Sequence, residues 1–138
     1  MRFIYLTMAC LALPVVLSCG STGRIMEDGR IYVENDLPAP TDPRTTNEAV
    51  VTYFDEDLSR EVTMIVPPEG GRKALGSECP EYGSEGKLFK GGTEVTVHIR
   101  TKTTGEAEED IVVTVDGNRT IRIVRMAYQS GSFEYEVR

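Results

Sequence analysis

The sequence predicts an all-β domain, a small antiparallel β-sandwich of immunoglobulin-like architecture with about seven or eight strands. Short runs after residue 24 alternate apolar with polar residues, which is the pattern of half-buried strands. No window carries apolar residues at the spacing of an amphipathic helix. A small β-barrel is the alternative, because the same strand pattern can close on itself.

The first predicted hairpin spans residues 50–66. Val50–Phe54 and Val62–Val66 are rich in β-branched and aromatic residues, and the polar stretch Asp55–Ser59 between them favours a turn. Clustered carboxylates at 55–57 are of the type that binds calcium, but they lack the spaced ligands and the glycine of a known calcium loop. We therefore interpret them as a solvated turn and expect no metal site.

Residues 95–99 and 133–137 predict two further strands. Each stretch alternates apolar with polar side chains, so each is expected to bury one face.

A second hairpin is predicted between residues 111 and 126. Two β-branched runs flank Asp116-Gly117-Asn118, and a three-residue loop is a common hairpin connection. The resulting register places Val113 opposite Ile121, with Asn118 in the left-handed conformation that such a loop needs. The same register pairs Ile111 with Ile123, and Glu109 with Arg125.

Two stretches do not resemble strands. Glu34–Glu48 contains three prolines among polar residues and is predicted to be an extended linker or a crossover between sheets. Pro67–Gly92 has 26 residues, with seven glycines and three prolines, and only Lys87–Lys90 within it favours a short strand. Because long loops in compact domains are often functional, we expect this segment to be the working surface of the domain rather than part of the core.

This segment carries five large contact-type side chains, and tyrosine and arginine are the types enriched at interface hot spots. We expect Tyr82 and Phe89 to be the main contacts, and Arg72 and Lys73 to be cationic contacts to an acidic partner. The predicted partner-binding residues are Arg72, Lys73, Tyr82, Leu88 and Phe89.

Catalytic and cofactor chemistry finds little support in the sequence. His98 is the single histidine, and the alternation of its strand places it on the polar face. Cys79 lies between acidic residues, which disfavour a reactive thiolate, so we do not expect a Cys79–His98 dyad. Cysteines and histidine are too few for a zinc site, and the glycine-rich segment has no phosphate-loop pattern. We therefore expect neither an enzyme nor a cofactor.

Residues 1–18 have the organisation of a secretory signal peptide. A positive charge at Arg2 precedes Phe3–Leu17, an apolar run interrupted only by Thr7 and Pro14. A transmembrane helix is the alternative, but this run is shorter than the roughly twenty residues that a bilayer needs.

The apolar run ends in Val16-Leu17-Ser18-Cys19-Gly20, which is similar to the lipobox of bacterial lipoproteins. The resemblance implies that residues 1–18 are removed and that Cys19 carries diacylglycerol and an N-linked acyl chain such as palmitate. Residues 19–24 would then be the lipidated N-terminus and tether, and 25–138 a single β domain. Gly20 differs from the aspartate of an inner-membrane retention signal, so we expect an outer-membrane protein that faces the periplasm or the cell surface.

The charge of the chain limits its partners. A net charge of −7 repels nucleic acid and anionic headgroups, so we expect membrane contact through the lipid alone. The predicted function is a non-enzymatic interaction or assembly module of the cell envelope, with an envelope protein as partner. The alternative is a ligand-, glycan- or inhibitor-type binding domain, for which the chain has six tyrosines, four phenylalanines and no tryptophan.

Overall fold

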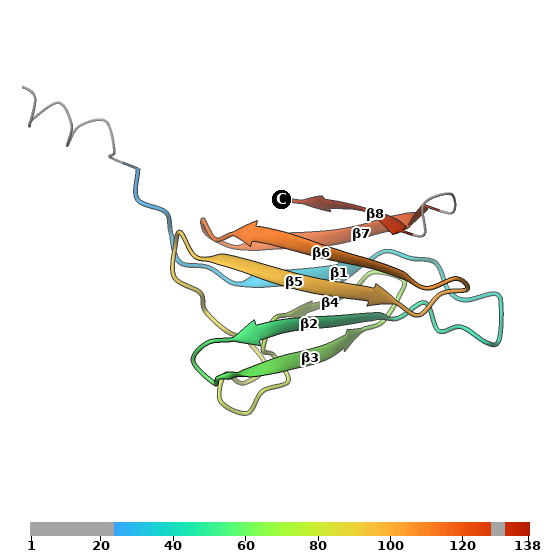
Figure 1. Cartoon of the computed structure of the whole chain (residues 1–138), viewed down its shortest axis with the longest axis horizontal. Helices are drawn as coiled ribbons and strands as arrows, with labels where there is room; N and C mark the ends of the chain where they lie inside the picture. The colour runs from blue at the N-terminus through green and yellow to red at the C-terminus, as the bar shows by residue number, and fades with distance from the viewer. Residues whose placement is uncertain (1–23, 128–131) are drawn as a thin grey trace, which may run out of the picture.

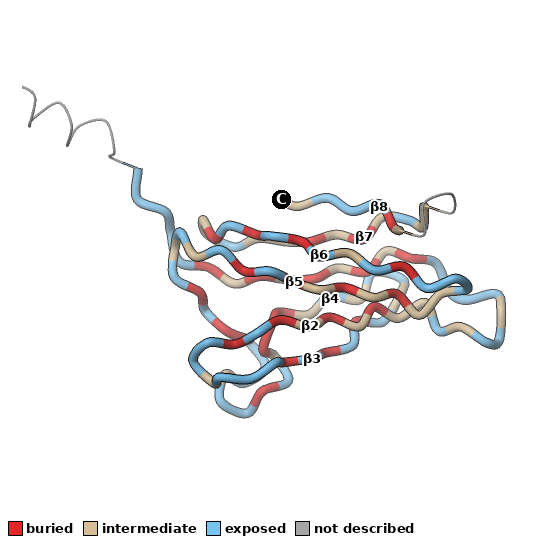
Figure 2. The backbone as a smooth tube through the Cα atoms, in the orientation of Figure 1, coloured by how far each residue is buried: buried red, intermediate tan, exposed pale blue. Residues whose placement is uncertain are grey.

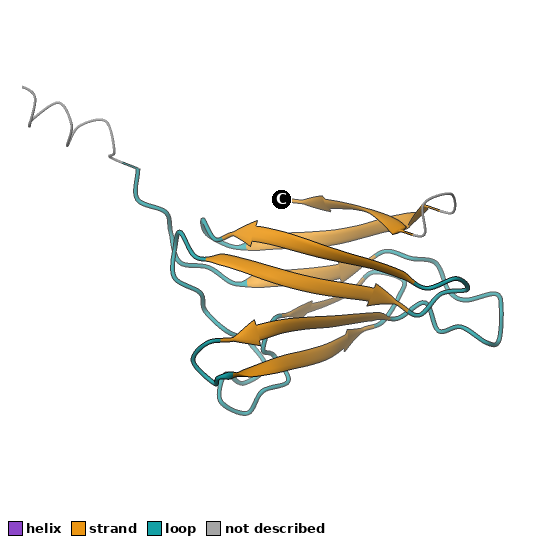
Figure 3. Ribbon diagram, viewed as in Figure 1, coloured by secondary structure: helices purple, strands orange, loops and turns teal. Residues whose placement is uncertain are grey.

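Two four-stranded sheets lie face to face in the computed structural model, which describes residues 24–127 and 132–138 (Figure 1). The predicted all-β sandwich is confirmed, because the two sheets do not close into a barrel and the described residues form strands and loops without a helix (Figure 3). The strands are β1 (Ile31–Asn35), β2 (Ala49–Asp55), β3 (Arg60–Val66), β4 (Gly71–Ala74), β5 (Glu94–Thr101), β6 (Ala107–Thr114), β7 (Arg119–Ala127) and β8 (Ser132–Val137). The predicted signal peptide and Cys19 lie outside the described residues.

The strand order is β4-β1-β7-β8 in one sheet and β3-β2-β5-β6 in the other. Neighbouring strands are antiparallel except β1 and β7, which run parallel. At one side of the sandwich β6 lies beside β8 of the other sheet, where Ser132 Oγ donates a hydrogen bond to Glu109.

The core lies between the sheets and is built from alternate residues of the strands (Figure 2). Burying each such Val or Ile side chain contributes about 1.5–3 kcal/mol. The fully buried side chains of the strands include Ile31, Val33, Val51, Val97, Ile99, Val113, Ile121 and Ile123.

The predicted hairpin at residues 50–66 is confirmed. β2 and β3 pair along their whole length, from Ala49 opposite Val66 to Asp55 opposite Arg60. The turn closes at Ser59, whose φ of 53° lies in the left-handed region. The strands predicted at 95–99 and 133–137 are also confirmed, as parts of β5 and β8.

The predicted hairpin at residues 111–126 is wrong. β6 pairs with β5, whereas β7 pairs with β1 and β8, so residues 115–118 cross from one sheet to the other. Gly117 rather than Asn118 takes the left-handed conformation, with a φ of 70°. The Asn118 side chain instead accepts a hydrogen bond from the Arg30 N–H, at 2.9 Å. Alternation shows that both strands bury one face, but it cannot distinguish neighbours in one sheet from strands in facing sheets.

The proline-containing stretch after β1 is a crossover between sheets, one of its two predicted forms. The prediction that Pro67–Gly92 stays out of the core is wrong. β4 lies within this segment, and Leu75, Cys79 and Phe89 are buried in the core. Instead of the short strand predicted at Lys87–Lys90, there is a single bridge between Phe89 and Gly29.

We predict that Val113→Ala destabilises the protein more than Thr114→Ala. Val113 is buried between the sheets and Thr114 is exposed, so the expected losses are about 2 kcal/mol and about 0.5 kcal/mol. Urea denaturation of both variants measures them. Equal losses would contradict the described packing of β6.

Candidate functional site

The most perturbed ionisable group belongs to a buried network around Asp55, at the end of β2. The Asp55 carboxylate is fully buried. Oδ2 accepts hydrogen bonds from the hydroxyls of Tyr53 (2.9 Å) and Tyr82 (2.7 Å). Oδ1 accepts from the Leu58 N–H and from Lys87 Nζ, both at 3.0 Å. The network joins the β2–β3 hairpin to the long segment after β4.

Hydrogen bonding decides the charge of this network. Burial raises the pKa of Asp55, but the bonds from Tyr82, Leu58 N–H and Lys87 outweigh it and lower the pKa to about 2. Burial lowers the pKa of Lys87, but Asp57 and Asp55 raise it above its usual value. Burial and the Asp55 carboxylate both raise the pKa of Tyr53. Asp55 and Lys87 are therefore ionised at neutral pH, and Tyr53 is neutral.

The Asp55 network is suited to holding structure rather than to chemistry. Four donors occupy the two carboxylate oxygens, which leaves little capacity to bind a substrate or an ion. In the described part of the chain, no group of three or more His, Cys, Asp or Glu residues is placed to hold a metal. The interpretation of residues 55–57 as a solvated turn is wrong for Asp55, because Lys87 and the tyrosines replace water around it.

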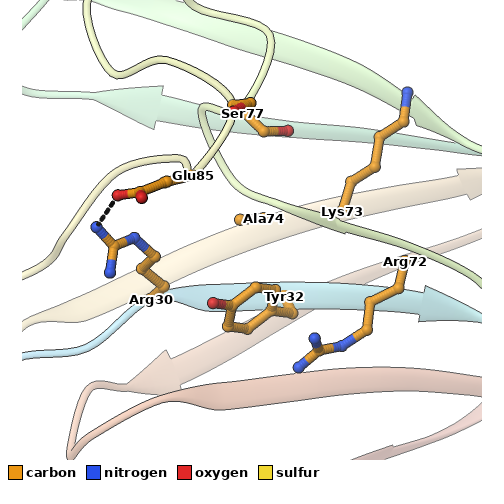
Figure 4. A pocket seen from close by; sticks show the side chains of 8 residues that line it. Arg30, Tyr32, Arg72, Lys73, Ala74, Ser77 and Glu85 are labelled. Carbon is orange, nitrogen blue, oxygen red and sulfur yellow. Dashed lines mark hydrogen bonds and ion pairs between the residues drawn. The ribbon is translucent and has the colours of Figure 1, made fainter.

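A second candidate is a pocket of about 520 Å³ at the edge where β4 pairs with β1, which we call the cationic pocket (Figure 4). It is lined by Arg30, Tyr32, Arg72, Lys73, Ala74, Ser77, Ser84 and Glu85. Three side chains are cationic and one is a carboxylate, on a chain with a net charge of −7. The pocket therefore concentrates positive charge on an otherwise acidic protein.

Arg72 is the cation of this pocket that lacks a carboxylate partner. Its guanidinium lies 3.9 Å from the centre of the Tyr32 ring and donates a long hydrogen bond, 3.4 Å, to Thr120 Oγ1. The residue opposite Arg72 in the β1–β4 register is Glu34, but Glu34 binds Arg138 at 3.0 Å. Within the described residues, no carboxylate lies within 4 Å of the Arg72 guanidinium.

Other residues of the cationic pocket also have polar groups that are weakly paired or unpaired within the described chain. Arg30 Nη2 contacts Glu85 at 3.3 Å, and the Glu85 side chain is 82% exposed. Arg30 Nε and Ser77 Oγ are buried and have no hydrogen-bond partner in the part of the chain that the structure describes, which is unusual for buried polar atoms. Lys73 is paired more closely, with Glu78 at 2.6 Å.

A third candidate, which we call the apolar hollow, has a volume of about 610 Å³. It opens where β2 and β5 separate, beyond the last pair of their ladder at Thr52 and His98. Its exposed apolar side chains are Phe54 and Leu88, at 60% and 53% exposure. The lining residues are Phe54, Glu56, Asp57, Thr93, the stretch 87–90 and the stretch 94–96.

The five predicted contact residues do not form one surface. Arg72 and Lys73 line the cationic pocket, Leu88 and Phe89 line the apolar hollow, and Tyr82 binds Asp55. The prediction that Phe89 is a surface contact is wrong. Its side chain is only 5% exposed and packs edge-to-face on Tyr53, with ring centres 5.9 Å apart.

Sequence reasoning missed Arg30, Tyr32 and Ser77 in the cationic pocket. Arg30 and Tyr32 alternate with buried Ile31 and Val33, so the strand pattern identifies their face. It does not identify β4 as the neighbouring strand. No sequence pattern around Ser77 indicates a place in a binding site.

Cys79 and His98 are not brought together. Cys79 is buried in the core. His98 lies on the outer face of β5, as predicted, with Nδ1 2.7 Å from Asp110. The two side chains therefore occupy opposite sides of the sheet.

We predict that Asp55 gives the fold a stability that acid removes. Because its pKa is about 2 in the fold and about 4 in an unfolded chain, its contribution is complete above pH 4 and is lost as the pH falls towards 2. The stability difference between wild type and Asp55→Asn should therefore shrink by about 2 kcal/mol from pH 7 to pH 2. Urea titrations at several pH values measure this, with Glu56→Gln as the exposed control. A pH-independent difference would refute it.

Comparison of the chain with models of known protein families gave no match. Neither curated proteins nor solved structures gave a significant match. In the described part of the chain, no helix has the length and apolar character to cross a bilayer. The function is therefore argued from the chain's own residues, and above all from the cationic pocket.

Proposed function

We propose that the protein is a lipid-anchored, non-enzymatic interaction module of the bacterial cell envelope. In this proposal it docks on an acidic envelope protein through the face that carries the cationic pocket. The main observation behind the docking is that the Arg72 guanidinium stacks on the Tyr32 ring and has no carboxylate partner among the described residues. Arginine is one of the residue types enriched at interface hot spots.

The structural setting of Arg72 favours binding. Stacking on Tyr32 restricts the guanidinium before any partner arrives, so less conformational entropy is lost on association. The opposite wall belongs to the segment after β4, which Asp55 holds through Tyr82 and Lys87. A docking surface on a rigid frame is more selective than one on a floppy loop.

The predicted anchor supports a partner close to the membrane. Arg30 of the pocket lies eleven positions after Cys19, so an extended tether spans at most about 40 Å. Residues 24–28, which precede β1, are exposed but still bonded to the sandwich, because Glu27 O accepts a hydrogen bond from the Gly117 N–H and Asp28 accepts one from the Gly91 N–H. Lipid on Cys19 would therefore keep the cationic pocket near the surface of the outer membrane, on its periplasmic or outer side.

The alternative function, a ligand- or glycan-binding domain, is favoured by the apolar hollow. Its volume of about 610 Å³ falls in the range of small-molecule sites, about 300–1,000 Å³. Phe54 and Leu88 supply apolar contact, and Lys90 is a cation without a carboxylate partner in the described part of the chain.

We predict that Cys19→Ser abolishes lipid labelling and releases the protein from the membrane fraction. The thioether-linked acyl chains supply the membrane affinity in this proposal, since each buried CH₂ contributes about 0.8 kcal/mol. Labelling with radioactive palmitate and fractionation of cells measure both effects. Cys79→Ser is the matched control and should remain labelled and membrane-bound. Membrane retention of the Cys19→Ser protein would disprove the anchor.

We predict that Arg72→Glu reduces partner recovery at least tenfold in a crosslinked pull-down from envelopes. Charge reversal removes the unpaired guanidinium and repels an acidic surface. Lys102→Glu is the matched control, because Lys102 also lacks a carboxylate partner in the described chain and lies outside the cationic pocket. Equal losses in both variants would mean that overall charge, rather than the pocket, governs association.

A further inference from the structure

We propose that the cationic pocket binds a carboxylate group of an acidic peptide segment, and that Glu85 of the chain itself competes for this place at Arg30. The inference rests on the proposed function, because it names the group that the partner would insert. It adds an internal competitor that sets the affinity of the pocket.

Arg72 supplies the open half of the site. Its guanidinium has five N–H donors in a planar fork, and among the described residues only the long contact to Thr120 Oγ1 uses one of them. Tyr32 covers one face of the fork, so the edges stay available to a ligand in the same plane. A carboxylate matches such an edge with two parallel hydrogen bonds.

Arg30 supplies the second half of the carboxylate site, and Glu85 already contacts it. The contact from Arg30 Nη2 to Glu85 is long, 3.3 Å, and the Glu85 side chain is 82% exposed. Exposed ion pairs of this kind contribute little, since ordering a long side chain offsets their attraction. A second carboxylate would therefore replace Glu85 at little cost.

Two residues of the same pocket, Arg30 and Ser77, each have a buried polar atom without a hydrogen-bond partner among the described residues. Arg30 Nε is a donor, and Ser77 Oγ is both donor and acceptor. Buried polar atoms are nearly always hydrogen-bonded, so a rotation of either side chain toward an oxygen-bearing ligand would give its polar atom a partner that the described chain does not supply. This separates the cationic pocket from an ordinary patch of exposed lysine and arginine.

The charge balance of the pocket favours a carboxylate over a phosphate. Glu85 lies at the rim, and it repels a dianion more strongly than a monoanion. The net charge of −7 acts in the same direction. The site is therefore better matched to a single negative charge carried by glutamate or aspartate.

The test titrates the full chain, purified from membranes in non-ionic detergent, with a blocked peptide that carries one glutamate among neutral residues, at low salt. Calorimetry measures the affinity, and inorganic phosphate is titrated in parallel. Arg72→Gln should weaken peptide binding at least tenfold. Glu85→Gln should strengthen it about threefold or more, because the competitor is gone. Glu81→Gln is the matched control, since Glu81 pairs with Arg60 outside the pocket, and it should leave the affinity unchanged.

Each other result overturns the proposal. Unchanged or weaker peptide binding by the Glu85→Gln variant would show that Glu85 does not compete for the pocket. Tighter binding of phosphate than of peptide to the wild type would show that the pocket does not prefer a carboxylate. The titration needs no partner, so its failure is distinct from that of the proposed function. If Arg72-dependent partner recovery succeeds while no peptide binds, the inference alone is wrong. If the peptide binds at Arg72 and no partner is recovered, the inference stands and the docking function is wrong.

Discussion

The buried ion pair between Asp55 and Lys87 is the constraint on which much of this structure depends. A carboxylate without water is tolerated only when its oxygens are fully hydrogen-bonded, and here two tyrosines, a backbone N–H and the ammonium group do this. Lys87 Nζ also lies 3.0 Å from Asp57. The end of one hairpin therefore fixes a segment about thirty residues further along the chain.

The fixed segment closes one side of the sandwich and builds both candidate binding surfaces. Next to Lys87, Phe89 enters the core against Tyr53 and bridges to Gly29. Earlier in the segment, Ser77 and Glu85 face β1 and β4 across the cationic pocket (Figure 4). The Asp55–Lys87 ion pair thus supports both the packing of the core and the shape of the cationic pocket.

Ion pairs on the β4-β1-β7-β8 sheet use carboxylates that would otherwise be available to Arg72. Arg122 binds Asp36 and Glu136, and Arg138 binds Glu34. Each exposed pair contributes at most about 1 kcal/mol, so their importance for stability is small. Their importance for recognition is larger, because they use the carboxylates beside Arg72.

The sequence by itself determined the fold class, the hairpin at 50–66 and the buried face of most strands, because alternation reports directly which side chains avoid water. It did not reveal β4, the crossing at Asp116–Asn118, or the burial of Asp55. Alternation states that a face is buried but not against what. Arg30 and Arg72 share a pocket because β1 pairs with β4, and Asp55 is buried because Tyr82 and Lys87 reach it from the segment after β4. Contacts between residues far apart in the chain decide such features, and only the tertiary structure contains them.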